Sequence, residues 1–193
     1  MESNRKKMRI ISGLFKGKII KFLKNSTTRP LKDIVKENIF NILCHSRTIK
    51  VDLINANVLD LYSGIGSFGI ECLSRGAKKV TFIETDYGAL NILKENINEL
   101  SISNKVLMVN QKVENYLKNN IKEKFNIFFF DPPFADNKYI ENLNLIKKNK
   151  IFKSNHVIII HREVKARDSL DEYFKTIFIK NYGRSKIIFG KFN

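Results

Sequence analysis

The stretch VLDLYSGIGSFG, residues 58–69, decides the fold. Its first five residues form a short apolar run typical of a buried strand, and glycines follow at positions 64, 66 and 69. Glycines at this spacing permit a tight turn, a close approach of a ligand to the backbone, and close packing of a following helix. The stretch therefore predicts a strand, a glycine-rich turn and a helix, the first unit of a parallel sheet covered by helices.

The chain from residue 51 onward repeats this alternation of apolar runs and amphipathic stretches. We expect strands at 58–62, 80–84, 106–110, 126–130 and 157–161, and helices at about 67–75, 87–99, 113–121 and 138–149. Two later apolar runs, joined by Tyr182, Gly183 and Arg184, predict a hairpin after a short helix near 167–172. The predicted fold class is α/β, Rossmann-like, with a mostly parallel seven-stranded sheet that ends in an antiparallel hairpin.

The first 50 residues differ from the rest and are strongly basic. RIISGLFKGKIIKF, residues 9–22, predicts a small β-hairpin around Lys16 and Gly17, and a helix is expected from about Leu31 to Cys44. The formal net charge is +16, but lysine is abundant throughout the chain, so the total alone is weak support for nucleic-acid binding. We expect residues 1–50 to form an extension on a domain of residues 51–193. This extension serves either to engage RNA or only to pack against the sheet.

Composition excludes several classes of protein. With 193 residues, 43% of them hydrophobic, the chain can build a packed core. No apolar run approaches the roughly 20 residues needed to span a bilayer, and the N-terminus does not read as a secretory signal, so we expect a cytoplasmic protein. The two cysteines and three histidines have no metal-type spacing, so no metal site is predicted.

Two acidic residues stand where a cofactor is expected. Asp60 is a carboxylate at the end of an apolar strand, where burial is unfavourable unless it faces hydrogen-bond donors or a ligand. Glu84 ends the next strand, about 20 residues beyond the glycines, where an acid can accept the hydroxyls of a ribose. This pattern predicts a nucleoside-containing cofactor and leaves open a dinucleotide or S-adenosylmethionine.

The segment FFFDPPF, residues 128–134, predicts the chemistry. Asp131 follows an apolar strand, and the two prolines make the next turn rigid. The Asp131 carboxylate and the Pro132 carbonyl can each accept an N–H of a planar amino group, while Phe134 can stack on a heterocycle. We therefore predict that Asp131, Pro132, Pro133 and Phe134 bind an exocyclic amine and direct it at an electrophilic methyl group.

These motifs together resemble the RsmD family of S-adenosylmethionine-dependent methyltransferases, which methylate N2 of a guanine in bacterial 16S ribosomal RNA. The resemblance covers nearly the whole chain. The segments that carry it are RIISGLFKGKII at 9–20, TRPLKDIVKENIFNIL at 28–43, DLYSGIGSFGIECLSRGA at 60–77, FIETD at 82–86, DPPF at 131–134 and YGRSKIIF at 182–189. It implies a class I methyltransferase fold, S-adenosyl-L-methionine as cofactor, and 16S rRNA or a small ribosomal subunit particle as partner.

The resemblance also implies roles for individual residues. We expect Asp60, Tyr62, Gly64, Gly66, Glu84, Thr85 and Gln111 at the cofactor, although Asn110 or Lys112 could contact the adenine in place of Gln111. We expect Arg9, Lys16, Lys18, Arg29 and Lys36 at the RNA. Lys36 stands where relatives usually have arginine, which keeps the charge but loses bidentate phosphate geometry.

Three other functions fit parts of the pattern. An N6-adenine DNA methyltransferase also presents an exocyclic amine to a DPPF segment. A basic RNA-binding assembly factor could retain the fold without turnover. A nicotinamide-dependent oxidoreductase is favoured by GIGSFG alone and disfavoured by DPPF and the closing hairpin.

His161 reads as a satisfied histidine at the end of a strand. We expect a monomer.

Overall fold

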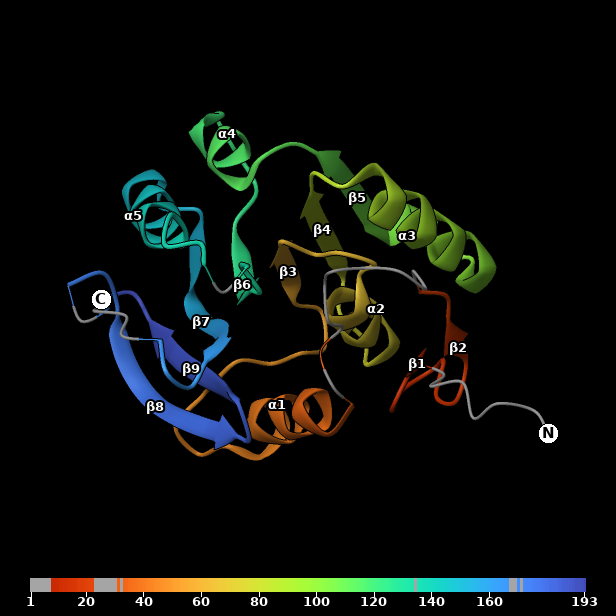
Figure 1. The fold of residues 1–193 in the computed structure, drawn as a ribbon, viewed down its shortest axis with the longest axis horizontal. Helices are drawn as coiled ribbons and strands as arrows, with labels where there is room; N and C mark the ends of the chain where they lie inside the picture. Colours follow the sequence, from red (N-terminus) through yellow and green to blue (C-terminus); the bar gives the residue numbers. More distant parts are fainter. Residues whose placement is uncertain (1–7, 23–30, 32, 134, 167–169, 171) are drawn as a thin grey trace.

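The computed structural model describes residues 8–22, 31, 33–133, 135–166, 170 and 172–193. It contains a seven-stranded sheet in the order β5-β4-β3-β6-β7-β9-β8 (Figure 1). The strands are β3 (Asn57–Leu61), β4 (Lys79–Glu84), β5 (Val106–Asn110), β6 (Phe125–Phe130), β7 (Phe152–Glu163), β8 (Lys175–Tyr182) and β9 (Ser185–Lys191). Strands β5, β4, β3, β6 and β7 pair with one another in parallel, whereas β9 pairs antiparallel with both β7 and β8. The predicted fold class is confirmed.

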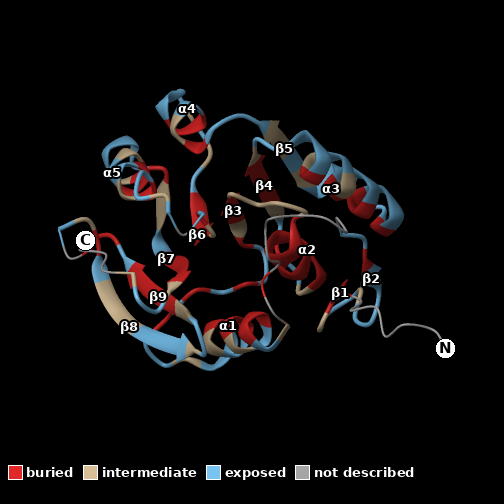
Figure 2. Ribbon diagram, in the orientation of Figure 1, coloured by how far each residue is buried: buried red, intermediate tan, exposed pale blue. Residues whose placement is uncertain are grey.

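Helices cover both faces of the sheet. The helices are α1 (Asp33–His45), α2 (Ser67–Ser74), α3 (Tyr87–Leu100), α4 (Val113–Lys118) and α5 (Tyr139–Asn149). Helices α1, α2 and α3 pack with one set of strand side chains, and α4 and α5 pack with the alternate set. Because successive strand residues point to opposite faces, the two apolar cores are separated by the sheet. Figure 2 shows the central strands and α2 buried between exposed outer helix surfaces.

The basic extension begins with a very short hairpin, β1 (Met8–Arg9) and β2 (Ile19–Ile20), and is bonded closely to helix α2. The backbone amides of Ile11 and Ser12 donate to the Glu71 carboxylate at 2.8 and 2.9 Å. Gly13 lies so close to the carbonyl of Ser74 that a Cβ atom there would be 1.9 Å from its oxygen. The hairpin strands are shorter than expected because these amides bond to α2 rather than to a neighbouring strand.

Other element boundaries agree with the predictions to within a few residues, with two differences. Strand β7 begins at Phe152, five residues before the predicted start, and α4 ends at Lys118 rather than at 121. The helix predicted near 167–172 falls largely outside the described residues. Within the described residues, no helix combines the length and apolar character needed to cross a membrane.

Candidate functional site

The predicted site residues lie at the carboxyl edge of the sheet. They lie beside β3, where the order of the strands in the sheet reverses, because β4 and β5 are added on one side of β3 and β6 and β7 on the other. Strand β3 pairs with β4 on one side and with β6 on the other. The helix after β3 packs on one face of the sheet and the helix after β6 on the opposite face. In open α/β sheets, ligands bind outside the strand ends at such a switch point.

The glycine turn after β3 has the conformation that its sequence predicts. Gly64 and Gly66 have φ angles of +54° and +79°, in the left-handed region that favours glycine. A Cβ atom at Gly64 would meet nothing within 4 Å, whereas one at Gly69 would lie 2.3 Å from a ring carbon of Phe82. Gly64 thus borders open space, and Gly69 allows α2 to pack closely on β4.

Asp60 is buried beneath this turn and binds the start of α2. Its Oδ2 accepts a hydrogen bond from the Gly69 amide at 3.0 Å. Burial raises the pKa of Asp60 well above its ordinary value of 3.8, and the Gly69 amide opposes that shift. The negative charges of Asp131 and Glu84 raise the pKa further.

Glu84 is held by backbone amides at the end of β4. Its Oε2 accepts from the Gly64 amide at 2.7 Å, and its Oε1 accepts from the amides of Thr85 and Asp86 at 2.7 and 2.9 Å. A carboxylate has about four acceptor positions, so Oε2 retains capacity for one further donor. Glu84 therefore fixes the shape of the glycine turn and still presents an oxygen at the sheet edge.

Two other predicted cofactor residues have partners within the protein, and two are exposed. The Tyr62 hydroxyl accepts from the Asn142 side chain at 2.9 Å, and burial raises the pKa of this phenol. The Asn110 side chain donates to the backbone carbonyls of Glu84 and Thr85, so its amide nitrogen ties β5 to β4. Gln111 and Thr85 are exposed at the same edge.

The acid of the D-P-P segment contacts His161, which the sequence predicts to be structural. Asp131 follows β6, and its amide donates to the Leu61 carbonyl at the end of β3 at 3.4 Å. The His161 Nδ1 lies 2.8 Å from Asp131 Oδ1. Strand β7 continues to Glu163, so the prediction that His161 ends its strand is wrong, although the residue has the hydrogen-bond partner that was expected. Phe134 lies outside the described residues.

The residues predicted to bind RNA divide into two groups. Arg9, Lys16 and Lys18 are exposed on the hairpin, and Arg29 lies outside the described residues. Lys36 requires a correction, because its side chain is fully buried and its ammonium donates to the Arg9 carbonyl and the Ser67 hydroxyl. Burial lowers the pKa of Lys36, and the carboxylate of Glu71, 3.9 Å away, opposes that shift. In this conformation Lys36 is not available to RNA.

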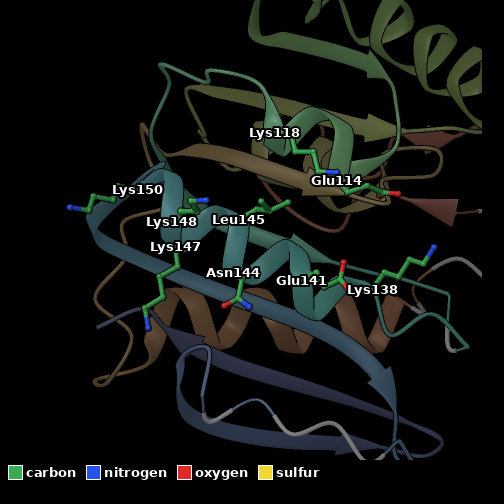
Figure 3. Close-up of a pocket in the computed structure, with 9 residues that line it drawn as sticks. All are labelled: Glu114, Lys118, Lys138, Glu141, Asn144, Leu145, Lys147, Lys148 and Lys150. Carbon is green, nitrogen blue, oxygen red and sulfur yellow. The ribbon is translucent and has the colours of Figure 1, made fainter.

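A groove of about 760 Å³ lies between α4 and α5, and no residue of the glycine turn lines it (Figure 3). We call it the α4–α5 groove. Its lining residues are Glu114, Lys118, Lys138, Glu141, Asn144, Leu145, Lys147, Lys148 and Lys150. Figure 3 shows Lys147, Lys148 and Lys150 at one end of α5 and Lys138 at the other. Lys138 is the N-cap of α5 and follows the D-P-P segment in the sequence, so this end of the groove is the one nearer to that segment along the chain.

The covered parallel sheet with its antiparallel hairpin, the glycine turn and the D-P-P segment together define a Rossmann-like methyltransferase. The family described as "Conserved hypothetical protein 95" matches residues 8–191. Curated relatives named ribosomal RNA small subunit methyltransferase D also match most of the chain, and the chain belongs to this RsmD family.

Individual relatives support this membership. Ribosomal RNA small subunit methyltransferase D of Haemophilus influenzae is 36% identical over 158 residues, which are 81% of this chain and 79% of the relative. The putative rRNA methyltransferase YlbH of Bacillus subtilis is 31% identical over 173 residues, 88% of this chain and 91% of the relative. The solved structure of a putative methyltransferase from Escherichia coli is 26% identical, covers 97% of this chain and 99% of its own, and has a TM-score of 0.81.

Proposed function

We propose that this protein transfers a methyl group from S-adenosyl-L-methionine to the exocyclic N2 amine of a guanine in 16S ribosomal RNA. The observation that carries the proposal is the juxtaposition of the D-P-P segment with the glycine turn, since the Asp131 amide donates to the Leu61 carbonyl directly before that turn. The names of the curated relatives favour ribosomal RNA of the small subunit as the substrate.

The residues at the sheet edge suit S-adenosylmethionine better than a dinucleotide. The carboxylates of Glu84 and Asp131 stand at this edge, which favours a cationic sulfonium and disfavours a pyrophosphate. The Gly69 amide near the start of α2, which could bind a phosphate, is already bound to Asp60. Asp60, Tyr62, Gly64, Gly66, Glu84, Thr85 and Gln111 would hold the cofactor. When bound, the cofactor supplies an electrophilic methyl group.

Within the chain, the D-P-P segment orients the acceptor. The Pro133 carbonyl already accepts from the Asp136 amide and the Arg162 guanidinium. The acceptor pair that we propose for the amine is therefore the Asp131 carboxylate and the Pro132 carbonyl. Asp131 would direct the nitrogen lone pair toward the methyl group and stabilise the positive charge that develops on nitrogen. The extra proton of the methylated amine would leave to water.

The RNA would contact two basic surfaces, the hairpin and the α4–α5 groove. Arg9, Lys16 and Lys18 are exposed on the hairpin, and five lysines line the groove. Lysines bind phosphates without reading sequence, so these surfaces would position the RNA while the D-P-P segment receives an unpaired or flipped base. We further propose that the protein acts as a cytoplasmic monomer.

A methyl-transfer assay tests the proposal. Radiolabelled S-adenosylmethionine is offered with small-subunit particles, purified 16S rRNA and DNA, and the modified base is identified by mass spectrometry. We expect N2-methylguanine in the small-subunit RNA, and we expect Asp131→Ala to lower kcat by roughly 100-fold or more. Asp52→Asn, which changes an exposed acid away from the site, is the control and should retain activity.

Each alternative predicts a different result. N6-methyladenine in DNA would establish the DNA methyltransferase and refute the rRNA proposal. Binding to small-subunit RNA without methyl transfer by the wild-type protein would indicate an assembly factor. Equal transfer by the wild-type and Asp131→Ala proteins would show that the D-P-P segment is not the amine site.

A further inference from the structure

Two consecutive residues of β7 contact the D-P-P loop from opposite faces of the sheet. His161 and Arg162 are adjacent, so their side chains point to opposite faces. The first contacts the Asp131 carboxylate and the second contacts the Pro133 carbonyl. The loop that follows β6 is therefore attached to the neighbouring strand at both ends of its D-P-P segment.

The His161 contact fixes one of the two oxygens of Asp131. Because an ionised carboxylate only accepts hydrogen bonds, the Nδ1 of His161 donates to Oδ1 across the 2.8 Å contact. The side chain of His161 is 9% exposed and that of Asp131 is 26% exposed. A buried donor thus holds one oxygen on the protein side, which leaves Oδ2 for an N–H of the amine.

The Arg162 contacts fix the backbone beyond the prolines. Its guanidinium is buried and donates to the Pro133 carbonyl at 3.2 Å and to the Asn137 side chain at 3.3 Å. It also lies over the Tyr139 ring, 4.7 Å from the ring centre. A planar guanidinium with several fixed donors can bridge two turns of a loop in a way that a lysine cannot.

We propose that His161 and Arg162 are positioning residues for methyl transfer, and this inference rests on the function proposed above. His161 orients the Asp131 carboxylate, and Arg162 sets the path of the backbone that carries the Pro132 carbonyl. Neither residue needs to touch the base. Loss of either one displaces the acceptor from the geometry of attack, so turnover falls much more than RNA binding does. A displacement of about 1 Å in such a site lowers the rate by up to about 100-fold.

His156 provides a matched control on the same strand. It is buried to the same degree as His161, since 8% of the whole residue is exposed against 7% for His161. Its Nε2 accepts from the Phe192 amide at 2.9 Å, and its Nδ1 lies 2.7 Å from the Lys153 carbonyl. These contacts join β7 to the C-terminal segment and involve no part of the D-P-P loop. Substitution there therefore reports the general effect of losing a buried histidine.

The kinetic test compares five variants with the wild-type protein. We expect His161→Leu and Arg162→Met to lower kcat about 10- to 100-fold, with KM for RNA and the dissociation constant for S-adenosylmethionine changed by less than about threefold. His161→Asn, which retains a donor near Nδ1, should recover at least part of the rate. Arg162→Lys should recover little. His156→Leu should lower the melting temperature and leave kcat of the folded protein near that of the wild type.

Hydrogen exchange tests the same inference without cofactor or RNA. The amides of Asp136 and Lys138 are bonded within the loop, to the Pro133 carbonyl and to Asp136 Oδ1. Both should exchange faster in His161→Leu and Arg162→Met than in the wild type and His156→Leu. Unchanged exchange in the first two variants, or a kcat loss in His156→Leu equal to that in His161→Leu, would overturn the inference. A wild-type protein that methylates no nucleic acid would refute the proposed function instead.

Discussion

Replacing Asp60 with asparagine should stabilise the folded protein while it weakens the cofactor site. Asp60 is 1% exposed, and it accepts one hydrogen bond, from the Gly69 amide. Asparagine has nearly the same shape, and its side-chain oxygen can still accept from that amide. The substitution therefore keeps the contact and removes the unfavourable burial of a carboxylate.

The sign and size of the effect follow from proton linkage. The folded-state pKa of Asp60 is raised above its ordinary value of 3.8, so between these two values the unfolded chain releases a proton that the folded chain retains. Wild-type stability consequently falls with rising pH in this window relative to that of Asp60→Asn. The gap grows by up to about 1.4 kcal/mol per pH unit, or about 3–6 °C in melting temperature for a domain of this size.

Urea unfolding at half-unit intervals from pH 4 to pH 7, without cofactor, measures this gap. Asp60→Asn should show little advantage at pH 4 and a growing one above it, together with weaker binding of S-adenosylmethionine. Asp52→Asn serves as the surface control and should show a smaller slope. A gap that stays flat over this range, or an asparagine variant that is less stable at every pH, would refute the assignment of Asp60 as a destabilising buried acid.

Two further predictions concern the buried polar contacts of the extension and the basic groove. Glu71→Gln should lower the free energy of unfolding by about 3–5 kcal/mol, because Glu71 is buried and balances the buried charge of Lys36. Lys36→Met should lower it by less than about 1.5 kcal/mol, since a chain of similar volume remains and Glu71 keeps its contacts with Arg75 and with two backbone amides. A Glu71→Gln loss no larger than this would contradict the reasoning; urea titration measures both. Changing three groove lysines to glutamine should reduce the slope of log K for RNA against log salt by up to about 2, as filter binding would show, whereas three exposed control lysines outside the groove should have a smaller effect. The groove lysines are Lys147, Lys148 and Lys150, and the controls are Lys78, Lys94 and Lys105.

The central sheet and its helices could be predicted because the pattern of apolar residues along each segment matches the burial of that segment in the structure. The strand predicted at 126–130 is observed as Phe125–Phe130 and is buried at every position, as its apolar residues on both faces require. The helix predicted at 87–99 is observed as α3, Tyr87–Leu100, and the residue before it, Asp86, caps it by accepting from the Ala89 amide. Such features depend on neighbours within a few residues, so a single sequence displays them.

The partners of polar side chains were not predictable in the same way. Lys36 belongs to a basic segment, which favours a surface role, yet Glu71 and Ser67 lie beside it only after α1 packs on α2. His161 meets Asp131, 30 positions earlier in the chain, because β6 pairs in parallel with β7 and places Phe130 opposite Ile160. Both partnerships depend on strand register and helix packing, which residue types and spacing do not reveal.

The strand order explains why the two halves of the proposed reaction meet. Strand β6 is separated from β3 in the chain by β4, β5 and three helices, yet it pairs directly with β3 and places Phe130 opposite Leu61. Adjacent strands lie about 4.8 Å apart, so the residues after Leu61 and after Phe130 emerge side by side. The first group is the glycine turn and the second is the D-P-P segment. Because β7 follows β6 in the sheet, it supports the D-P-P segment from the far side, through His161 and Arg162. An amine acceptor at this place is thus supported by a neighbouring strand, and substitutions of His161 or Arg162 in β7 should change methyl transfer even though β7 carries no part of either motif.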